Sequence, residues 1–170
     1  MTDAASSNST GSANEIELIR GFYGDAMHTS DWFVVTQDLV DKFGIATYDS
    51  DWIHTDPARA RSESPYRNTI AQGFWTLSML TFLSRNANGG HYPPGARIGI
   101  NYGLDGVRFP GPVRVGERIR LRFKLVDIAC RNDGQYLVRT ENVIEVEGQN
   151  KPALVANWLF LLVYRTGSST

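Results

Sequence analysis

The chain lacks the features by which secreted, membrane-spanning, zinc-binding and nucleic-acid-binding proteins are usually identified. Its 170 residues include one cysteine, Cys130, which excludes an internal disulfide bond and a cysteine-rich zinc site. No apolar run reaches the roughly 18 residues that a membrane-spanning helix needs. The 17 basic and 18 acidic side chains include no basic run of the kind that binds nucleic acid or anionic lipid. We therefore predict a cytoplasmic protein with no metal site, no membrane contact and no nucleic-acid partner.

The two ends of the chain have little apolar surface to bury. Residues 1–14 are mostly Ser, Thr, Asn, Ala and Gly, without the basic start and apolar core of a secretion signal. This composition predicts a disordered N-terminal tail, and residues 166–170 are expected to be equally loose. No repeat or linker divides the remaining residues 15–165, so we predict that they form one domain.

The first half of this domain has helical patterns. Apolar residues recur at helical spacing over residues 15–27 and again up to about Ile45, with strand-like composition over residues 32–36 between them. Residues 68–85 are apolar on every side, which predicts a helix buried in the core. Asn68 or Thr69 is the expected cap at its start, and residues 88–90 (Asn-Gly-Gly) are the expected end.

From residue 98 onward the pattern changes to that of strands. Over residues 118–128, Ile119, Leu121 and Phe123 alternate with basic residues, as in a strand with one buried face. The strands are expected at residues 98–102, 107–109, 118–128, 135–147 and 151–164. The fold class is therefore predicted as α+β, with one core helix against an antiparallel meander. The edge strands of such a sheet favour a homodimer.

A polar loop before the core helix concentrates titratable groups. A carboxylate beside an imidazole suits general acid–base catalysis, although a loop that caps helices has the same composition. Asp56 followed by Pro57 is typical of a helix start. Asp51 lies three residues before His54 and would meet it on one helical turn. Asp49 lies five residues before His54 and would reach it only through an irregular turn of the backbone.

Four blocks of residues occur in order along the chain: Asp49-x-x-Trp52-Ile53-His54-x-Asp56-Pro57, Thr69-Ile70-Ala71-x-Gly73-Phe74-x-Thr76-Leu77-Ser78, Ile100-Asn101-Tyr102-Gly103-Leu104 and Val107-Arg108-Phe109. With these blocks the chain resembles, from about residue 35 to residue 164, the MaoC-like hydratases and dehydratases in the NodN-like branch of the hotdog fold. The resemblance implies a long central helix wrapped by a curved antiparallel sheet, usually in a dimer. It also implies hydration of a trans-2-enoyl thioester to the (R)-3-hydroxyacyl thioester, or the reverse dehydration. No cofactor is implied beyond the coenzyme A or acyl carrier of the substrate.

The resemblance assigns roles to individual residues. The family's catalytic aspartate and histidine fall on Asp49 and His54, with Asp49 as the base and His54 orienting the same water. Gly73, at the start of the core helix, would present a backbone N–H to the thioester oxygen, because a residue without Cβ allows close approach. Thr81 lies eight residues after Gly73, where some related hydratases have a serine near the site.

The chain departs from the family pattern at three positions. Tyr48, Asp51 and Gln72 stand where such families usually have a glycine, a neutral polar residue and a histidine. Tyr48 would narrow the pocket mouth, Asp51 would add a second carboxylate, and Gln72 would keep hydrogen-bonding capacity without titrating. All three are therefore candidate substrate-binding residues. A thioesterase on the same fold and a non-catalytic acyl-thioester-binding protein remain as alternative functions, because fold does not determine function.

Overall fold

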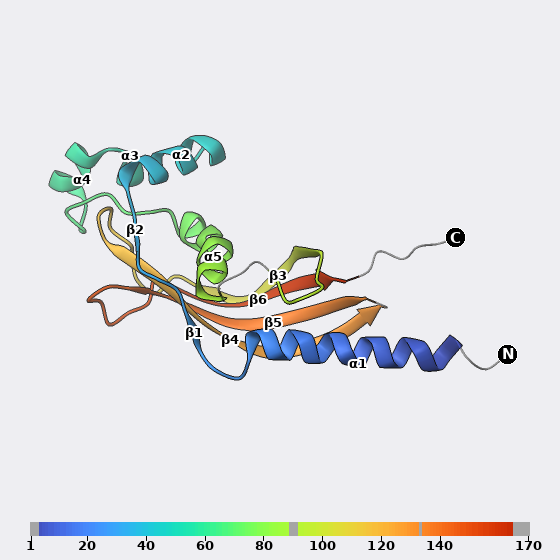
Figure 1. The fold of residues 1–170 in the computed structure, drawn as a ribbon. Coiled ribbons are helices and arrows are strands. Elements are labelled where there is room, and N and C mark those ends of the chain that lie inside the picture. Colours follow the sequence, from blue (N-terminus) through green and yellow to red (C-terminus); the bar gives the residue numbers. More distant parts are fainter. Residues whose placement is uncertain (1–3, 89–91, 133, 165–170) are drawn as a thin grey trace.

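The protein combines helices with one antiparallel sheet, as predicted (Figure 1). The computed structural model describes residues 4–88, 92–132 and 134–164. Its helices are α1 (Ala4–Tyr23), α2 (Gln37–Thr47), α3 (Trp52–Thr55), α4 (Pro57–Glu63) and α5 (Gly73–Asn88). Its strands are β1 (His28–Thr29), β2 (Phe33–Val34), β3 (Ile98–Arg108), β4 (Arg118–Asn132), β5 (Gln135–Val146) and β6 (Leu154–Val163). No helix in these ranges is long and apolar enough to cross a membrane.

The sheet has the strand order β1-β4-β5-β6-β3, and β2 also pairs with β4. All pairings are antiparallel, with Val138 opposite Phe160 and Thr140 opposite Trp158 between β5 and β6. Every second residue of β5 from Tyr136 to Val146 is buried, so the even-numbered side chains form the inner face. The alternation predicted for β4 is confirmed at its start, because Ile119, Leu121 and Phe123 are buried.

Helix α5 lies against the inner face of this sheet and contacts β4 and β6 (Figure 1). Its side chains Leu80 and Leu83 are buried, whereas its Phe74 remains 69% exposed in the single chain. The helix is therefore covered on one side only, and the sheet does not close around it. The expectation of a helix buried on every side is wrong for this reason.

The predicted start of the core helix is also corrected. Residues before Gly73 are extended because they pair with the segment before β4: Ala71 N–H donates to Val113 O (2.8 Å) and Val115 N–H donates to Thr69 O (3.0 Å). Asn68 caps no helix, since its Nδ2 donates to Val115 O (2.9 Å). The prediction that residues 88–90 end the helix falls partly outside the described residues.

Helix α1 begins at Ala4, within the segment predicted to be disordered. Its buried residues Glu15, Ile19 and Tyr23 are four apart and pack on the inner face of the sheet, where Tyr136 Oη donates to Glu15 Oε2 (2.5 Å). Once this stripe anchors the helix, extending it toward the N-terminus adds one hydrogen bond per ordered residue. The helix ends at Tyr23 instead of Met27 because Gly24 follows with φ +58. Residues 1–3 and 166–170 lie outside the described residues.

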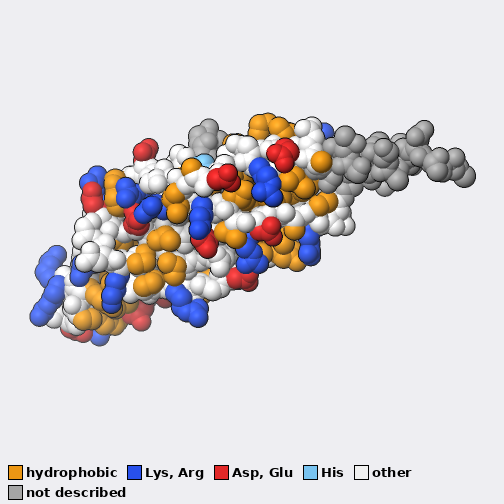
Figure 2. Space-filling view, turned by 90° about the horizontal axis from the view of Figure 1, so that it is seen from below, with side chains coloured by type: hydrophobic (Ala, Val, Ile, Leu, Met, Phe, Trp, Pro, Cys, Tyr) orange, Lys and Arg blue, Asp and Glu red, His pale blue; other side chains and the backbone are white. Residues whose placement is uncertain are grey.

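Charged side chains of both signs are interspersed on the surface (Figure 2). Across the outer face of the sheet, Glu145 Oε2 accepts from Arg120 Nε (2.8 Å) and Glu145 Oε1 accepts from Arg122 Nη1 (3.1 Å). Lys124 pairs with Glu141 in the same way (2.8 Å). Cross-strand pairs of this kind favour the register of β4 against β5.

Candidate active site

The polar loop that carries the candidate acid–base pair starts at the C-terminal end of α2. Tyr48 adopts the left-handed conformation (φ 59), and Asp49 N–H donates back to Gly44 O (2.9 Å). This turn lies just before Asp49, and the segment between Asp49 and His54 is itself irregular up to the start of α3 at Trp52. The side chain of Tyr48 is 97% exposed, so in the single chain it does not narrow a pocket. The carboxylate of Asp49 is also exposed and makes no hydrogen bond with the described residues.

The capping residues of the loop hold two short helices in place. Asp51 caps α3, since its Oδ1 accepts from Ile53 N–H (3.3 Å). Asp56 caps α4, since its Oδ1 accepts from Arg59 N–H (2.9 Å), with Pro57 as the first helical residue. The prediction for Asp56 and Pro57 is confirmed. Asp51 was predicted to contact the substrate, but in the structure its carboxylate caps a helix.

His54 is held on both its backbone and its ring. Its Nδ1 lies 2.7 Å from Ile70 O, and because a carbonyl oxygen only accepts, Nδ1 carries the proton. Neutral imidazole with a proton on Nδ1 has Nε2 as an acceptor, which is the arrangement that receives a proton from water. The carbonyl of His54 accepts from Gln37 Nε2 (2.6 Å), and Gln37 Oε1 accepts from Thr69 Oγ1 (2.6 Å).

Gln72 connects the loop of Asp49 to the start of α5. Its side chain is 1% exposed, and its Nε2 donates to Asp49 O (3.2 Å) and to Val40 O (3.3 Å). Gly44 makes room for this contact, because a Cβ at position 44 would lie 2.8 Å from Asp49 O and 3.2 Å from Gln72 Nε2. The sequence placed Gln72 among substrate-binding residues. The geometry instead gives it contacts with the backbone that carries Asp49.

Gly73 is the first residue of α5, where backbone N–H groups lack partners within the helix and the helix dipole is positive. It lines a hollow of about 260 Å³ together with Thr76 and Phe109. The ring of Phe109 lies 3.4 Å from the position that a Cβ of residue 73 would occupy. Phe109 also makes an edge-on contact with Phe74, with ring centroids 6.3 Å apart. A ligand that approaches the N–H of Gly73 therefore meets Phe109.

Two residues just before α5 connect the loop of Asp49 and His54 to the start of that helix. Ile70 binds the ring of His54 and Gln72 binds the backbone of Asp49, so both elements are tied to the segment that leads into Gly73. The sequence did not identify Gln37 or Gly44 as parts of this site. Gly44 had a local signal, a glycine inside a helical pattern. Gln37 had none, because its two partners at this site, His54 and Thr69, lie 17 and 32 residues away.

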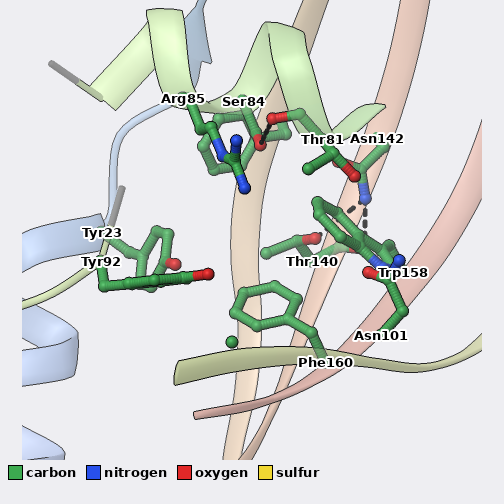
Figure 3. A pocket seen from close by; sticks show the side chains of 12 residues that line it. Tyr23, Thr81, Ser84, Arg85, Tyr92, Asn101, Thr140, Asn142, Trp158 and Phe160 are labelled. Carbon is green, nitrogen blue, oxygen red and sulfur yellow. Dashed lines mark hydrogen bonds between the residues drawn. The ribbon is translucent and has the colours of Figure 1, made fainter. Parts of the chain in front are cut away.

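Thr81 lies about 12 Å further along the helix axis, estimated at 1.5 Å per residue. It faces a separate cavity of about 210 Å³ between α5 and the inner face of the sheet (Figure 3). Aromatic residues form much of the cavity wall: Tyr23, Tyr92, Phe123, Trp158 and Phe160. Burial, with smaller contributions from Tyr164 and Tyr92, raises the pKa of Tyr23, so its phenol stays protonated over the ordinary pH range.

The cavity also has a buried polar side. Thr140 and Asn142 project from β5 and are 1% and 2% exposed. Asn142 Nδ2 donates to Thr140 O (2.8 Å), Thr140 Oγ1 (2.9 Å) and Ala156 O (3.4 Å). Its Oδ1 is buried and has no donor among the described residues. Arg85, at the same cavity, has an exposed side chain without an ion pair in the described part of the chain.

Comparison with known proteins gives matches over most of the chain. Residues 21–147 match the family model described as MaoC like domain. The chain is 40% identical over 141 residues to Nodulation protein N of Rhizobium leguminosarum bv. viciae, covering 83% of this chain and 86% of that protein. It is 42% identical over 133 residues to 3-hydroxyacyl-thioester dehydratase Z of Mycobacterium tuberculosis, covering 78% of this chain and 85% of that protein.

Solved structures share the fold at low sequence identity. The R-hydratase PhaJ1 from Pseudomonas aeruginosa has a TM-score of 0.66 and 16% identity, covering 83% of this chain and 82% of that chain. The HadBC (3R-hydroxyacyl-ACP dehydratase) complex from Mycobacterium tuberculosis has a TM-score of 0.65 and 15% identity, covering 80% of this chain and 94% of that chain. The predicted hotdog fold is confirmed, and the second of these neighbours is a complex of several chains.

Proposed function

This chain belongs to the MaoC-like domain family, and we propose that it adds water to trans-2-enoyl thioesters, giving (R)-3-hydroxyacyl thioesters, or catalyses the reverse dehydration. The relatives named as a 3-hydroxyacyl-thioester dehydratase and an R-hydratase support hydro-lyase chemistry. Coenzyme A is the proposed carrier of the acyl group, and the cytoplasm is the proposed compartment. The reaction needs no metal ion or redox cofactor, since acid–base groups and backbone donors supply each step.

One observation carries the proposal. The hydrogen bond from His54 Nδ1 to Ile70 O fixes the ring tautomer so that Nε2 accepts, within a loop that Gln72 ties to the start of α5. A water bound to Nε2 would be oriented with a lone pair free for attack. General acid–base groups placed in this way typically contribute about 10²–10⁴ in rate.

In the hydration direction, the proposed step begins with removal of a proton from water by Asp49. The water oxygen forms a bond to C3, the C2–C3 double bond breaks, and its electron pair moves onto the thioester oxygen as an enolate. The N–H of Gly73 and the positive end of the α5 dipole would stabilise this charge. The enolate then re-forms the carbonyl and takes a proton at C2 from protonated Asp49, assisted by His54. One water is added in total, and the enzyme returns to its starting state.

A homodimer is the proposed assembly. Strand β3 pairs with β6 along one edge, and its other edge has no strand partner among the described residues. Along β3 the side chains of Ile98, Ile100 and Tyr102 are each close to half exposed. An exposed apolar edge strand of this length is a ready surface for pairing with a second copy. Sedimentation of the full chain tests this, and a monomer at micromolar concentration would contradict it.

The function is tested by following the enoyl-thioester absorbance of crotonyl-CoA with the purified protein. We expect the band to disappear with the wild type and persist with Asp49→Asn and with His54→Gln, at unchanged thermal stability. Chiral analysis of the product then tests the (R) configuration. Full activity in either variant would overturn the assignment of Asp49 and His54. Released free thiol would identify a thioesterase, and binding without conversion would identify an acyl-thioester-binding protein.

A further inference from the structure

The side chain of Gln37, at the start of α2, joins three segments that are distant in the sequence. Its Nε2 donates to His54 O (2.6 Å) in α3 and to Asp41 Oδ1 (2.7 Å) in α2, and its Oε1 accepts from Thr69 Oγ1 (2.6 Å) before α5. A carbonyl oxygen and an ionised carboxylate only accept, so the two N–H groups of the amide face them and Oε1 faces the hydroxyl. The three partners together therefore fix the orientation of the amide.

The bond to His54 O matters because a helix as short as α3 is not stable by itself. It has four residues, and a single turn gains too few hydrogen bonds to offset the ordering of its backbone. The last carbonyls of a helix also have no partner inside it. In α3 the carbonyl of Ile53 accepts from Ile70 N–H (3.1 Å) and that of His54 accepts from Gln37 Nε2. The end of α3 is thus held by α2 and by the segment before α5.

The ring of His54 is bound to the same segment that Gln37 binds. Its Nδ1 donates to Ile70 O, and the preceding residue, Thr69, donates to Gln37. Thr69 is 0% exposed, so the segment that provides both contacts is itself held in the core. Releasing the carbonyl of His54 would let α3 turn away from residues 69–70 and would break the ring contact that decides the tautomer.

We infer that Gln37 is a positioning residue for the proposed reaction: it holds the backbone of α3 so that His54 Nδ1 reaches Ile70 O and Nε2 stays free to accept a proton. The inference rests on the proposed function, because the state of Nε2 affects turnover only if His54 takes part in proton transfer with water. Gln37 acts through the backbone carbonyl of His54 and not through the reacting atoms.

Nitrogen-15 NMR of the full chain, labelled at its histidines, tests the inference without requiring turnover. The chain has three histidines, and the signal missing from His54→Gln identifies the ring of His54. At about pH 8, where imidazole is mostly neutral, the wild type should show a protonated Nδ1 and an unprotonated Nε2 at His54. His28 is an internal reference that should not change in any variant, because its Nε2 is bonded to Tyr23 O.

Two variants remove the donors of Gln37. Gln37→Met keeps the length of the side chain, and we expect its His54 signals to move toward those of a ring that exchanges between two tautomers. Its kcat for crotonyl-CoA should fall by about 10–100-fold with KM nearly unchanged, because a misplaced group slows the chemical step. Gln37→Glu keeps an acceptor for Thr69 but, when ionised, has no donor for His54 O. The same result is expected, and this variant replaces Gln37→Met if that one does not fold.

Thr36→Ala is the matched control. Thr36 precedes Gln37 and caps the same helix, with its Oγ1 accepting from Leu39 N–H (3.4 Å). Removing an N-cap lowers the stability of a helix, so the thermal midpoint should fall. The lost hydroxyl is bonded to Leu39 and not to His54 or Thr69, so the tautomer of His54 and kcat should keep their wild-type values.

The outcomes are distinct from those of the activity test. A His54 signal in Gln37→Met that matches the wild type would overturn the inference, and so would a wild-type ring protonated on Nε2. Equal changes in Thr36→Ala would also overturn it, since any loosening of α2 would then move the ring. Turnover that Gln37→Met keeps in full would leave the proposed function standing and overturn the role of Gln37. A changed tautomer in a chain that converts no enoyl thioester would support the hold of Gln37 on His54 and overturn the proposed function.

Discussion

The two ends of α5 hold polar groups in opposite ways. At its N-terminal end, the loop of Asp49 and His54 is fixed through backbone carbonyls, and the Asp49 carboxylate remains exposed. Toward its C-terminal end, Thr140 and Asn142 are almost fully buried in the sheet. Proton transfer with water needs groups that solvent can reach, whereas discrimination between ligands gains most from groups removed from solvent. The difference therefore separates a region suited to chemistry from one suited to recognition.

The largest expected effect comes from the exposed region. Asp49→Asn should lower kcat/KM for an enoyl thioester by about 10²–10⁴, because the base is removed. The thermal midpoint should stay within about 2 °C, since the carboxylate makes no hydrogen bond with the described residues. Asp51→Asn is the comparison: asparagine also caps a helix, so a much smaller loss of activity is expected. Equal losses would mean that the local spacing, which favoured Asp51, had identified the base.

A second change, at Gln72, tests whether the exposed loop of Asp49 and His54 depends on a buried side chain. Gln72→Glu cannot donate to Asp49 O or Val40 O and introduces a carboxylate at a buried position. We expect kcat to fall by about 10–100-fold through displacement of the loop and the free energy of unfolding to fall by about 1–3 kcal/mol. Gln72→Leu removes the donors without adding charge and should be less destabilising. An unchanged kcat with lowered stability would show that Gln72 supports the fold without positioning Asp49.

This contrast also explains what the sequence could predict. Asp49, His54, Asp56 and Pro57 lie within nine positions, so local spacing and capping rules describe much of their arrangement. The caps of α3 and α4 follow the sequence pattern, and Thr36 caps α2, accepting from Leu39 N–H (3.4 Å). The resemblance was needed to choose Asp49 over Asp51, because local spacing alone favoured Asp51, which lies three residues before His54.

The remaining features depend on contacts between distant segments. Residues 68–72 have helical composition but pair with residues 113–115, so tertiary hydrogen bonds override the local preference. The cavity draws residues from α1, α5 and four strands, and no window of sequence contains more than a few of them. The sequence predicted a strand over residues 135–147, but not that Thr140 and Asn142 on its inner face would meet a cavity. The start of α1 at Ala4 was missed because composition alone argued against order there.

A third change, at Gly99, acts on the cavity beside Thr81 and leaves the loop of Asp49 and His54 unchanged. Gly99 lies beside Tyr92, and a Cβ at position 99 would lie 2.4 Å from Tyr92 Cε1. Gly99→Ala must therefore displace the Tyr92 ring, which lines the cavity. We expect the free energy of unfolding, measured with urea, to fall by about 1–3 kcal/mol, as for other overpacked sites. Gly103→Ala on the same strand has no such neighbour and is the control. Equal losses of stability in the two variants would show that displacing the Tyr92 ring has no cost of its own.

The smallest expected effect lies outside both regions and separates the pH dependence of folding from that of catalysis. Burial would raise the pKa of Glu145, but hydrogen bonds from Arg120 and Arg122 outweigh it and hold the pKa below its ordinary value of 4.5. Because the folded-state pKa is lowered, this carboxylate stabilises the fold fully above about pH 4.5, and the contribution is lost as the pH falls through the folded-state pKa. Glu145→Gln should therefore be less stable than the wild type at pH 7, by about 1 kcal/mol or less, and the difference should shrink in acid. Urea unfolding of both proteins between pH 7 and pH 3 measures it, and a difference independent of pH would refute the electrostatic origin. Since this loss occurs only in acid, the Glu145 ion pairs would not account for a change in turnover between pH 5.5 and pH 8.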